Sequence, residues 1–199
     1  MILKICGITN QEDATAAVEG GATAVGFNFY PRSPRYIAPE RAAEIATAPG
    51  VRRVGVFVNE SPERIAEVVR TARLGTAQLH GDEASPDVRN SASIWKAVRV
   101  DERCDLSAYD GWAVEALLLD GPAGADYGGM GRAFDWQRVR ETRQNIVLAG
   151  GLNPTNIALA VERVRPWGVD ACSLLESAPG KKDHKKMTEF LHAAMLAAR

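Results

Sequence analysis

The sequence contains few cysteines and histidines, and those present are scattered. Cys6, Cys104 and Cys172 are an odd number of thiols, lie far apart and include no CxxC pair. This pattern argues against a disulfide framework and against a structural zinc site, and it favours a reducing compartment. The three histidines form no cluster of metal ligands either, so we expect no metal site and a cytoplasmic protein.

An excess of one charge and long apolar runs are missing as well. The chain has 24 basic and 25 acidic residues, which gives a formal net charge of -1. No overall field therefore attracts nucleic acid or an anionic membrane, and an anionic ligand must be held by local groups. No run of apolar residues approaches the ~20 needed to cross a bilayer, and the first residues do not resemble a signal peptide. We expect neither nucleic acid nor membrane as a partner.

One pattern recurs along the 199 residues: a short apolar or β-branched run, a polar or glycine turn, and a helical segment. The runs expected to be strands are residues 2–6, 23–29, 53–58, 76–80, 94–100, 115–120, 145–150 and 168–173. No linker or low-complexity segment divides the chain, so residues 1–199 are expected to form a single domain. Eight strands alternating with helices predict an α/β protein of the (β/α)₈, or TIM-barrel, type.

The segments expected to be helical are residues 11–21, 39–47, 61–73, 134–142 and 153–165, followed by a final one that carries His184 and His192. Asn10, Ser61 and Asn153 stand where an N-cap is favoured, and a proline follows two of them. A doubly wound open sheet is the alternative arrangement. Such sheets usually carry a glycine-rich fingerprint after the first strand, and the turn CGITNQED has none, so the barrel is favoured.

Polar or small residues follow most of the expected strands. In a (β/α)₈ barrel the active site lies at the carboxyl ends of the strands, so these residues are the candidates. They are Cys6, Arg35, His80, Asp120, Gly150, Gly151 and Ser173. The glycine pair and the turn around Ser173 follow the seventh and eighth strands, where this architecture commonly binds phosphate.

These motifs resemble one enzyme family. The segments KICGITNQEDA, GFNFYPRSPRYI, VGVFVN, AQLHGDE, LLLDGP, GGMGRAFDW, LAGGLNPTN and SAPGKKDH occur in the order found in phosphoribosylanthranilate isomerases. The resemblance covers nearly the whole chain. It implies a barrel enzyme of tryptophan biosynthesis that performs the Amadori rearrangement of N-(5-phosphoribosyl)anthranilate, the third step from chorismate, without metal or organic cofactor.

The resemblance also implies roles for individual residues. Cys6 is expected to be the general base and Asp120 the general acid. Arg35 is expected to bind the anthranilate carboxylate of a small phosphorylated substrate, and a monomer is the default. His80 and Gly129 are further substrate-binding candidates, and the phosphate-binding candidates are Gly150, Gly151, Ser173 and Leu174. A packing role for His80 is about as well supported as a contact with substrate.

Strand alternation places Lys4 on the same face as Cys6, inside the barrel below the thiol. A buried ammonium group needs a partner. The eighth strand neighbours the first in a closed barrel and carries Asp170. We therefore predict an ion pair between Lys4 and Asp170.

Three positions depart from the usual pattern of the family: Leu174 where glycine is common, Met130 where threonine or serine is common, and Asn28 where an apolar residue is common. Leu174 places a bulky residue where backbone normally approaches phosphate. A barrel that has lost or narrowed its activity therefore remains an alternative, which the retained Cys6 and Asp120 oppose. Another phosphosugar enzyme, an epimerase or an indole-forming synthase, is disfavoured because the metal ligands or lysine acids it would need at the strand ends are missing.

Overall fold

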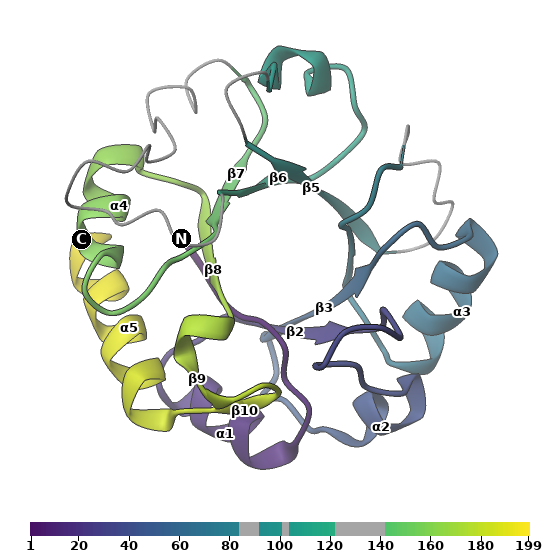
Figure 1. The fold of residues 1–199 in the computed structure, drawn as a ribbon, viewed down its shortest axis with the longest axis horizontal. Coiled ribbons are helices and arrows are strands. Elements are labelled where there is room, and N and C mark those ends of the chain that lie inside the picture. Colours follow the sequence, from purple (N-terminus) through teal and green to yellow (C-terminus); the bar gives the residue numbers. More distant parts are fainter. Residues whose placement is uncertain (84–91, 101–103, 122–141) are drawn as a thin grey trace.

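The computed structural model describes residues 1–83, 92–100, 104–121 and 142–199, and within them eight parallel strands close into a barrel (Figure 1). The strands are β1 (Ile2–Ile5), β2 (Ala24–Asn28), β3 (Arg52–Phe57), β4 (Thr76–Leu79), β5 (Ser93–Arg99), β6 (Ala116–Asp120), β7 (Ile146–Ala149) and β8 (Gly168–Ala171). Each strand pairs with the next along the chain, and β8 pairs with β1. The prediction of a (β/α)₈ barrel is confirmed, each strand within two residues of its expected ends, and the open sheet is excluded.

The described α-helices lie outside the barrel and follow β1, β2, β3, β7 and β8 (Figure 1). They are α1 (Gln11–Glu19), α2 (Pro39–Glu44), α3 (Pro62–Thr71), α4 (Ile157–Val164) and α5 (His184–Ala197), with short 3₁₀ helices η1 (Leu106–Tyr109) and η3 (Ser173–Leu175). After η3 comes a small hairpin, β9 (Glu176–Ala178) and β10 (Lys181–Lys182). The helix expected at 134–142 lies, apart from its last residue, outside the described residues. No described helix is both long and apolar enough to cross a membrane.

Two of the three predicted N-caps are confirmed. The side chain of Asn10 accepts a hydrogen bond from Asp13 N at 2.8 Å, and that of Ser61 accepts one from Arg64 N at 3.2 Å. The prediction for Asn153 is wrong. Its side chain closes a separate turn by accepting from Thr155 N, and α4 begins only at Ile157.

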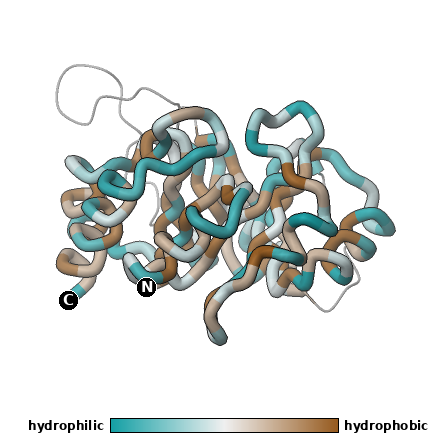
Figure 2. Tube along the Cα trace, turned by 90° about the horizontal axis from the view of Figure 1, so that it is seen from below, coloured by the Kyte–Doolittle hydropathy of each residue, from teal (hydrophilic) through white to brown (hydrophobic). Residues whose placement is uncertain are grey.

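The strand residues alternate between two packed cores. Inside the barrel lies a cluster formed by Ala24, Val54, Trp95, Ala97, Ala116, Leu118, Val147 and Ala149. Residues of the opposite parity, such as Leu3, Ile5 and Phe27, face outward into the larger core beneath the helices. Along these helices hydrophobic and hydrophilic positions alternate (Figure 2), which is typical of helices with one face on a sheet.

Polar groups close the amino-terminal end of the barrel. The guanidinium of Arg52 lies 5.7 Å from the ring centroid of Trp95 and 5.9 Å from that of Trp167. Arg52 also forms an ion pair with Glu115, whose carboxylate accepts a hydrogen bond from the Trp95 indole at 2.8 Å. Large side chains therefore pack at this end of the barrel, opposite the end where this architecture places its active site.

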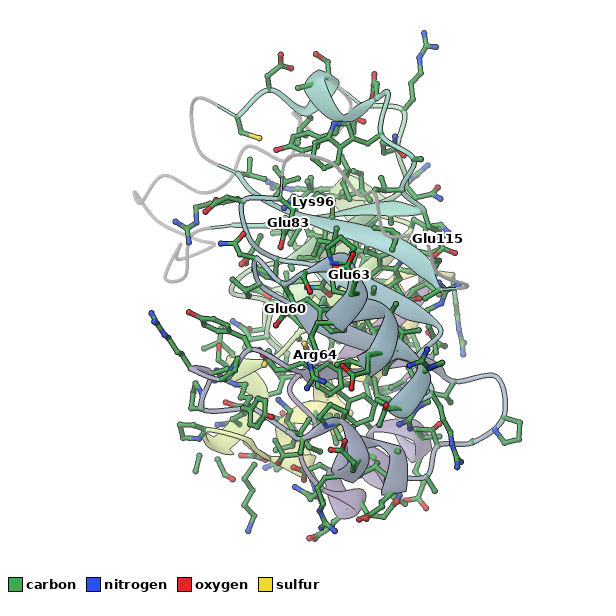
Figure 3. All side chains as sticks on the ribbon, turned by 90° about the vertical axis from the view of Figure 1, so that its right-hand side faces the viewer. Glu60, Glu63, Arg64, Glu83, Lys96 and Glu115 are labelled. Atoms are coloured by element: carbon green, nitrogen blue, oxygen red, sulfur yellow. The ribbon has the colours of Figure 1, made fainter. Side chains whose placement is uncertain are left out.

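A buried ion pair ties the loop after β4 to β5. Lys96 Nζ donates to Glu83 Oε2 and to the Gly81 carbonyl, both at 2.6 Å (Figure 3). The Glu83 carboxylate also accepts from the backbone N–H of Asn59 at 2.9 Å. Burial by itself would raise the pKa of Glu83, but these hydrogen bonds have the larger effect, so the pKa of Glu83 lies below its usual value. The loops after β3 and β4 are thereby fixed at the edge of the site.

Candidate active site

A cavity of about 310 Å³ opens at the carboxyl ends of the strands. Its wall contains residues from seven of the eight strands or the loops that follow them: Cys6, Asn28, Arg35, Val56, Val58, Gln78, His80, Leu118, Asp120, Ala149, Gly150, Gly151, Leu152, Asp170, Ala171, Cys172, Ser173 and Leu174. The volume lies at the lower end of the range of small-molecule sites. All the described candidate residues predicted from the sequence therefore border one cavity.

Cys6 follows the last residue of β1 and is buried, with 8% of its surface exposed. Its thiol packs against Gly26 on β2, where an added Cβ atom would come within 2.8 Å of the Cys6 sulfur. The absence of a side chain at Gly26 thus leaves room for the thiol inside the barrel. The pKa of Cys6 is well below the usual value because a hydrogen bond with Cys172 and the charge of Lys4 outweigh the effect of burial.

The predicted ion pair below Cys6 is confirmed. Lys4 Nζ lies 2.9 Å from Asp170 Oδ2, and the Lys4 side chain is fully buried. Lys4 and Asp170 are register partners on β1 and β8. Burial raises the pKa of Asp170 to about 7 even though Lys4 opposes that shift. The pKa of Lys4 is raised, because attraction to Asp170 and Cys6 exceeds the cost of its burial.

Asp120 is the last residue of β6, and His80 follows β4. Their side chains face each other with His80 Nε2 3.3 Å from Asp120 Oδ2, and both are partly exposed to the cavity. The other ring nitrogen, His80 Nδ1, lies 3.0 Å from Gln78 Nε2. When the Gln78 amide donates to Nδ1, the ring proton is on Nε2 and points to Asp120. His80 therefore borders the cavity and lies against the carboxyl group of Asp120, and its contact with substrate stays a prediction.

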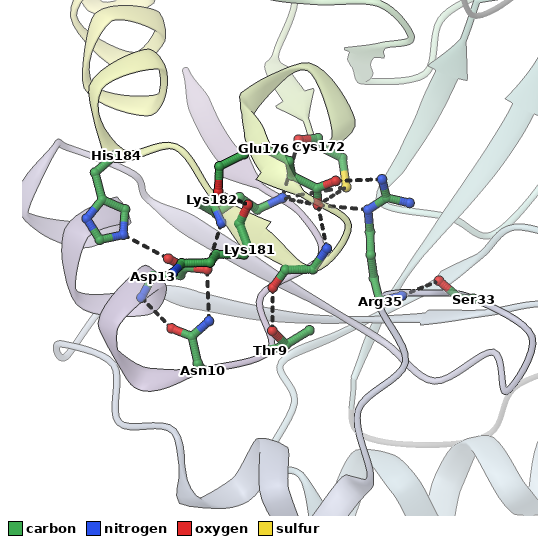
Figure 4. Close-up of polar contacts among 12 residues, drawn as sticks. Thr9, Asn10, Asp13, Ser33, Arg35, Cys172, Glu176, Lys181, Lys182 and His184 are labelled. Atoms are coloured by element: carbon green, nitrogen blue, oxygen red, sulfur yellow. Dashed lines mark hydrogen bonds and ion pairs between the residues drawn. The ribbon is translucent and has the colours of Figure 1, made fainter.

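Arg35, in the loop after β2, is held by a carboxylate of the protein (Figure 4). Its Nε and Nη2 atoms donate to the two oxygens of Glu176 at 2.8 and 2.6 Å. The fully buried Lys182 ammonium on β10 lies 3.0 Å from Glu176 Oε1. One edge of the guanidinium is thus bound to Glu176. No hydrogen bond from Nη1 to any described residue is found, so the edge formed by Nη1 and Nη2 can receive a second carboxylate.

The turns after β7 and β8 bring backbone to the cavity. Gly150 and Gly151 both have positive φ values, 78° and 68°, which glycine adopts without steric cost. A Cβ atom at Gly150 would lie 2.4 Å from Gly121 N, so the turn also needs glycine for close packing. Leu174 borders the cavity and is 47% exposed.

Two of the residues singled out in the sequence, Gly129 and Met130, lie outside the described residues. Conversely, the cavity contains Gln78 and Cys172, which the sequence reading did not select. The sequence did contain a signal for both. Gln78 stands two residues before His80, and Cys172 stands two residues after Asp170. Because strand residues two apart point to the same face, each was expected to lie on the face of its neighbour. Lys182 is the buried member of the Lys181–Lys182 pair, and no pattern in the sequence distinguishes it from its exposed neighbour.

Comparisons with known proteins show the family to which the chain is similar. The family model for N-(5′-phosphoribosyl)anthranilate (PRA) isomerase matches residues 3–193. A protein of Solibacter usitatus named N-(5′-phosphoribosyl)anthranilate isomerase is 58% identical over 197 residues, which span 99% of this chain and 98% of that protein.

Two solved structures extend the comparison. The phosphoribosyl anthranilate isomerase of Thermus thermophilus is similar with a TM-score of 0.87 and 36% identity, and the match covers 100% of both chains. A crystal structure of phosphoribosyl anthranilate isomerase in complex with reduced 1-(o-carboxyphenylamino)-1-deoxyribulose 5-phosphate has a TM-score of 0.84 and 42% identity, covering 98% of this chain and 99% of that one.

Proposed function

The chain belongs to the N-(5′-phosphoribosyl)anthranilate isomerase family, and from this premise we propose that Cys6 and Asp120 are its general base and general acid. The reaction converts N-(5-phosphoribosyl)anthranilate to 1-(2-carboxyphenylamino)-1-deoxyribulose 5-phosphate. The observation that carries the assignment is that one cavity contains both groups, at the carboxyl ends of β1 and β6, which lie three positions apart around the closed barrel.

The first half of the reaction opens the furanose ring. A proton must reach the ring oxygen while the aryl nitrogen forms an iminium with C1, and a carboxylic acid can deliver that proton. Asp120 is the candidate because its carboxyl group faces the cavity and contacts His80. The His80 ring lies 3.3 Å from this carboxyl group and can orient it.

The second half removes the proton from C2 of the iminium to give an enol amine, which converts to the ketone product. A thiolate can take this proton, and a free thiol with a pKa of about 8.5 needs help to ionise near neutral pH. The Lys4 ammonium supplies that help, and the positive charge of the iminium adds to it. Cys6 is the base in this scheme because its pKa is lowered and its thiol borders the cavity.

Binding of the two ends of the substrate follows from the charged and backbone groups around the cavity. The edge of Arg35 not used by Glu176 would bind the anthranilate carboxylate in a two-pronged contact. The glycine turn at 150–151 and the turn around Ser173 and Leu174 would receive the phosphate through backbone N–H groups. Gly129 is kept as a substrate-binding candidate on the resemblance alone.

The test is to follow the loss of the fluorescence of the anthranilate ester with purified protein and with the variants Cys6→Ala and Asp120→Asn. Wild-type protein should catalyse the reaction, and each variant should lose at least about 100-fold in kcat. An inactive wild-type protein would overturn the proposed activity. An active variant would overturn the role of that residue only.

We further propose that the protein works in the cytoplasm as a monomer with residues 1–199 as its single domain. None of the three cysteines forms a disulfide, which favours a reducing compartment. The cavity is built from one chain, so no second copy is required to complete it. Sedimentation of the purified protein across a range of concentrations tests the monomer, which a mass of two chains would contradict.

A further inference from the structure

Glu176, the first residue of β9, does not belong to the cavity wall, yet it binds the arginine that does. Arg35 Nε and Nη2 donate to its two carboxylate oxygens at 2.8 and 2.6 Å. The side chains are 21% exposed for Arg35 and 4% exposed for Glu176. A guanidinium bound to both oxygens of one carboxylate is fixed in place and in rotation. A residue outside the cavity therefore sets the direction of the remaining edge of Arg35.

The aliphatic part of the Arg35 side chain is fixed as well. A Cβ atom at Gly7 would lie 2.7 Å from Arg35 Cδ, so the stem of the arginine packs directly on the backbone of Gly7. The φ value of Gly7 is 75°, which glycine adopts without steric cost. Arginine loses much rotamer freedom when it is ordered. Here backbone under the stem and a carboxylate at the head order it in advance.

Glu176 is in turn held by a buried cation. Lys182 is its register partner on β10, and the fully buried Lys182 ammonium lies 3.0 Å from Glu176 Oε1. Gly180 N donates to the same oxygen at 3.4 Å, and the Cys172 thiol is 4.0 Å from it. Burial by itself would raise the pKa of Glu176, but the hydrogen bonds from Arg35 and Lys182 have the larger effect and lower it. The carboxylate is therefore charged at neutral pH.

The hairpin formed by β9 and β10 is fastened to α1 and to the loop before it (Figure 4). Lys182 N donates to Asp13 Oδ2 at 2.9 Å, and His184 Nε2 lies 2.8 Å from Asp13 Oδ1. Thr9 Oγ1 donates to the Gly180 carbonyl at 2.6 Å. The contacts that hold the arginine thus continue without a break into a helix of the barrel.

The charges of this cluster argue for orientation rather than for attraction. Arg35 and Lys182 are cations and Glu176 is an anion, so the three side chains together carry one positive charge. If the cluster served only to attract an anionic ligand, Glu176 would weaken it by cancelling one of the two cations. Glu176 instead offers a fixed geometry for the guanidinium, at the cost of part of the attraction.

We infer that Glu176 is a positioning residue for Arg35: by binding Nε and Nη2 it holds the other edge of the guanidinium ready for a carboxylate of the substrate, and Lys182 holds Glu176. This inference rests on the proposed function, in which Arg35 binds the anthranilate carboxylate. It assigns to the hairpin a part in substrate selection, through residues that touch the arginine rather than the substrate.

The experiment measures the Kd of two ligands by titration calorimetry. One is reduced 1-(o-carboxyphenylamino)-1-deoxyribulose 5-phosphate, and the other is the same compound made from aniline, which lacks the carboxylate. The proteins are wild type, Glu176→Gln, Lys182→Met and the double variant. A glutamine offers only one acceptor oxygen to the guanidinium and turns a donor towards it. The double variant loses one charge of each sign, so it keeps the net charge of the wild-type cluster.

Binding of the carboxylate ligand must then order a free arginine. Its Kd should rise about 3- to 10-fold in Glu176→Gln and in the double variant. Lys182→Met keeps the pair of Arg35 and Glu176 and should change this Kd less. The Kd of the aniline ligand should stay at its wild-type value in all three. In steady-state kinetics KM for the natural substrate should rise by the same factor, with a smaller change in kcat.

An effect of charge alone gives the opposite order of affinities. Glu176→Gln would then bind the carboxylate ligand more tightly than wild type, Lys182→Met would bind it more weakly, and the double variant would match wild type. Dependence on the arginine is tested in an Arg35→Met protein. There the change Glu176→Gln should have no further effect on the ratio of the two Kd values.

Glu67→Gln is the matched control. It removes a carboxylate from another arginine pair, in which Arg64 Nη1 lies 2.7 Å from Glu67 Oε2, and neither residue borders the cavity. Both Kd values should stay unchanged. Urea denaturation shows which variants are folded. Glu176→Gln leaves the buried Lys182 ammonium without its carboxylate, which costs stability, and the double variant removes that ammonium.

An unchanged or lower Kd for the carboxylate ligand in the folded double variant would overturn the inference, and so would an equal weakening of both ligands. If wild-type protein bound the two ligands equally well, the proposed role of Arg35 would be wrong instead. A wild-type protein without isomerase activity would overturn the proposed reaction. Calorimetry needs no turnover, so it would still decide whether Glu176 positions Arg35.

Discussion

Lys4 Nζ lies 2.9 Å from Asp170 Oδ2, on neighbouring strands and two residues below the proposed base. A double-mutant cycle of Lys4→Met and Asp170→Asn measures this contact as a coupling free energy. At about pH 8 both groups are charged, and we expect a stabilising coupling of about 1–3 kcal/mol in urea denaturation. At about pH 5 the carboxyl group holds its proton, and the coupling should fall towards zero. A coupling that does not change with pH would show that the pair is not ionic.

The same carboxyl group predicts how folding stability depends on pH. Burial raises the pKa of Asp170 to about 7 in the folded protein, against about 4 in the unfolded chain. Between these values the folded state holds a proton that the unfolded state has lost, so this group makes stability fall as pH rises. The free energy of unfolding of wild type minus that of Asp170→Asn should therefore decrease from about pH 4 to pH 7 and level off above. An increase over this range would contradict the assignment.

The ion pair between Lys4 and Asp170 was predictable from sequence because three simple rules apply to these two residues. Strand alternation put Lys4 on the inner face with Cys6, barrel closure made β8 the neighbour of β1, and a buried ammonium group requires an anion. The eight strands were predictable for a related reason. Their apolar runs are short and evenly spaced, and a parallel strand that is covered on both faces needs such a run.

Other features depended on contacts between residues far apart in the chain, which no local pattern records. The helix expected from Asn153 begins at Ile157 because the Asn156 side chain bonds instead to Gly151 O at 2.9 Å and fixes the glycine turn. Arg35 is held by Glu176, 141 positions away. Cys6 and Cys172 likewise become neighbours only once β8 pairs with β1.

Arg35 should determine recognition of the substrate carboxylate. Arg35→Lys keeps a positive charge but loses the flat two-pronged edge, so we expect KM for the natural substrate to rise about 10- to 100-fold with a smaller change in kcat. The analogue made from aniline has no carboxylate, and its kinetics should hardly change. Steady-state kinetics with both substrates separates this effect from a general loss of structure.

Arg32 provides the matched control for this experiment, since it is exposed, lies in the same loop and is absent from the cavity wall. Arg32→Lys should leave KM for both substrates unchanged. If Arg35→Lys weakened the two substrates equally, the carboxylate would have to be bound elsewhere.

Gly26 should be the residue of β2 most sensitive to an added methyl group. A Cβ atom there would lie 2.8 Å from the Cys6 sulfur and 3.0 Å from Lys4 Cε. These atoms belong to the proposed base, Cys6, and to Lys4 below it. Lys4 cannot move away from the added methyl group without losing its contact with Asp170. Gly26→Ala should therefore cost about 1–3 kcal/mol of stability by overpacking. By shifting the thiol it should also lower kcat up to about 100-fold.

Gly111→Ala separates this steric effect from the general consequence of losing a glycine. Gly111 is exposed, and nothing lies within 4 Å of the position its Cβ atom would take. That variant should stay within about 0.5 kcal/mol of wild type in urea denaturation and keep its kcat. If Gly26→Ala were equally harmless, the Cys6 thiol could not be packed against β2. Cys6 and Lys4 would then have to lie in different positions from those described.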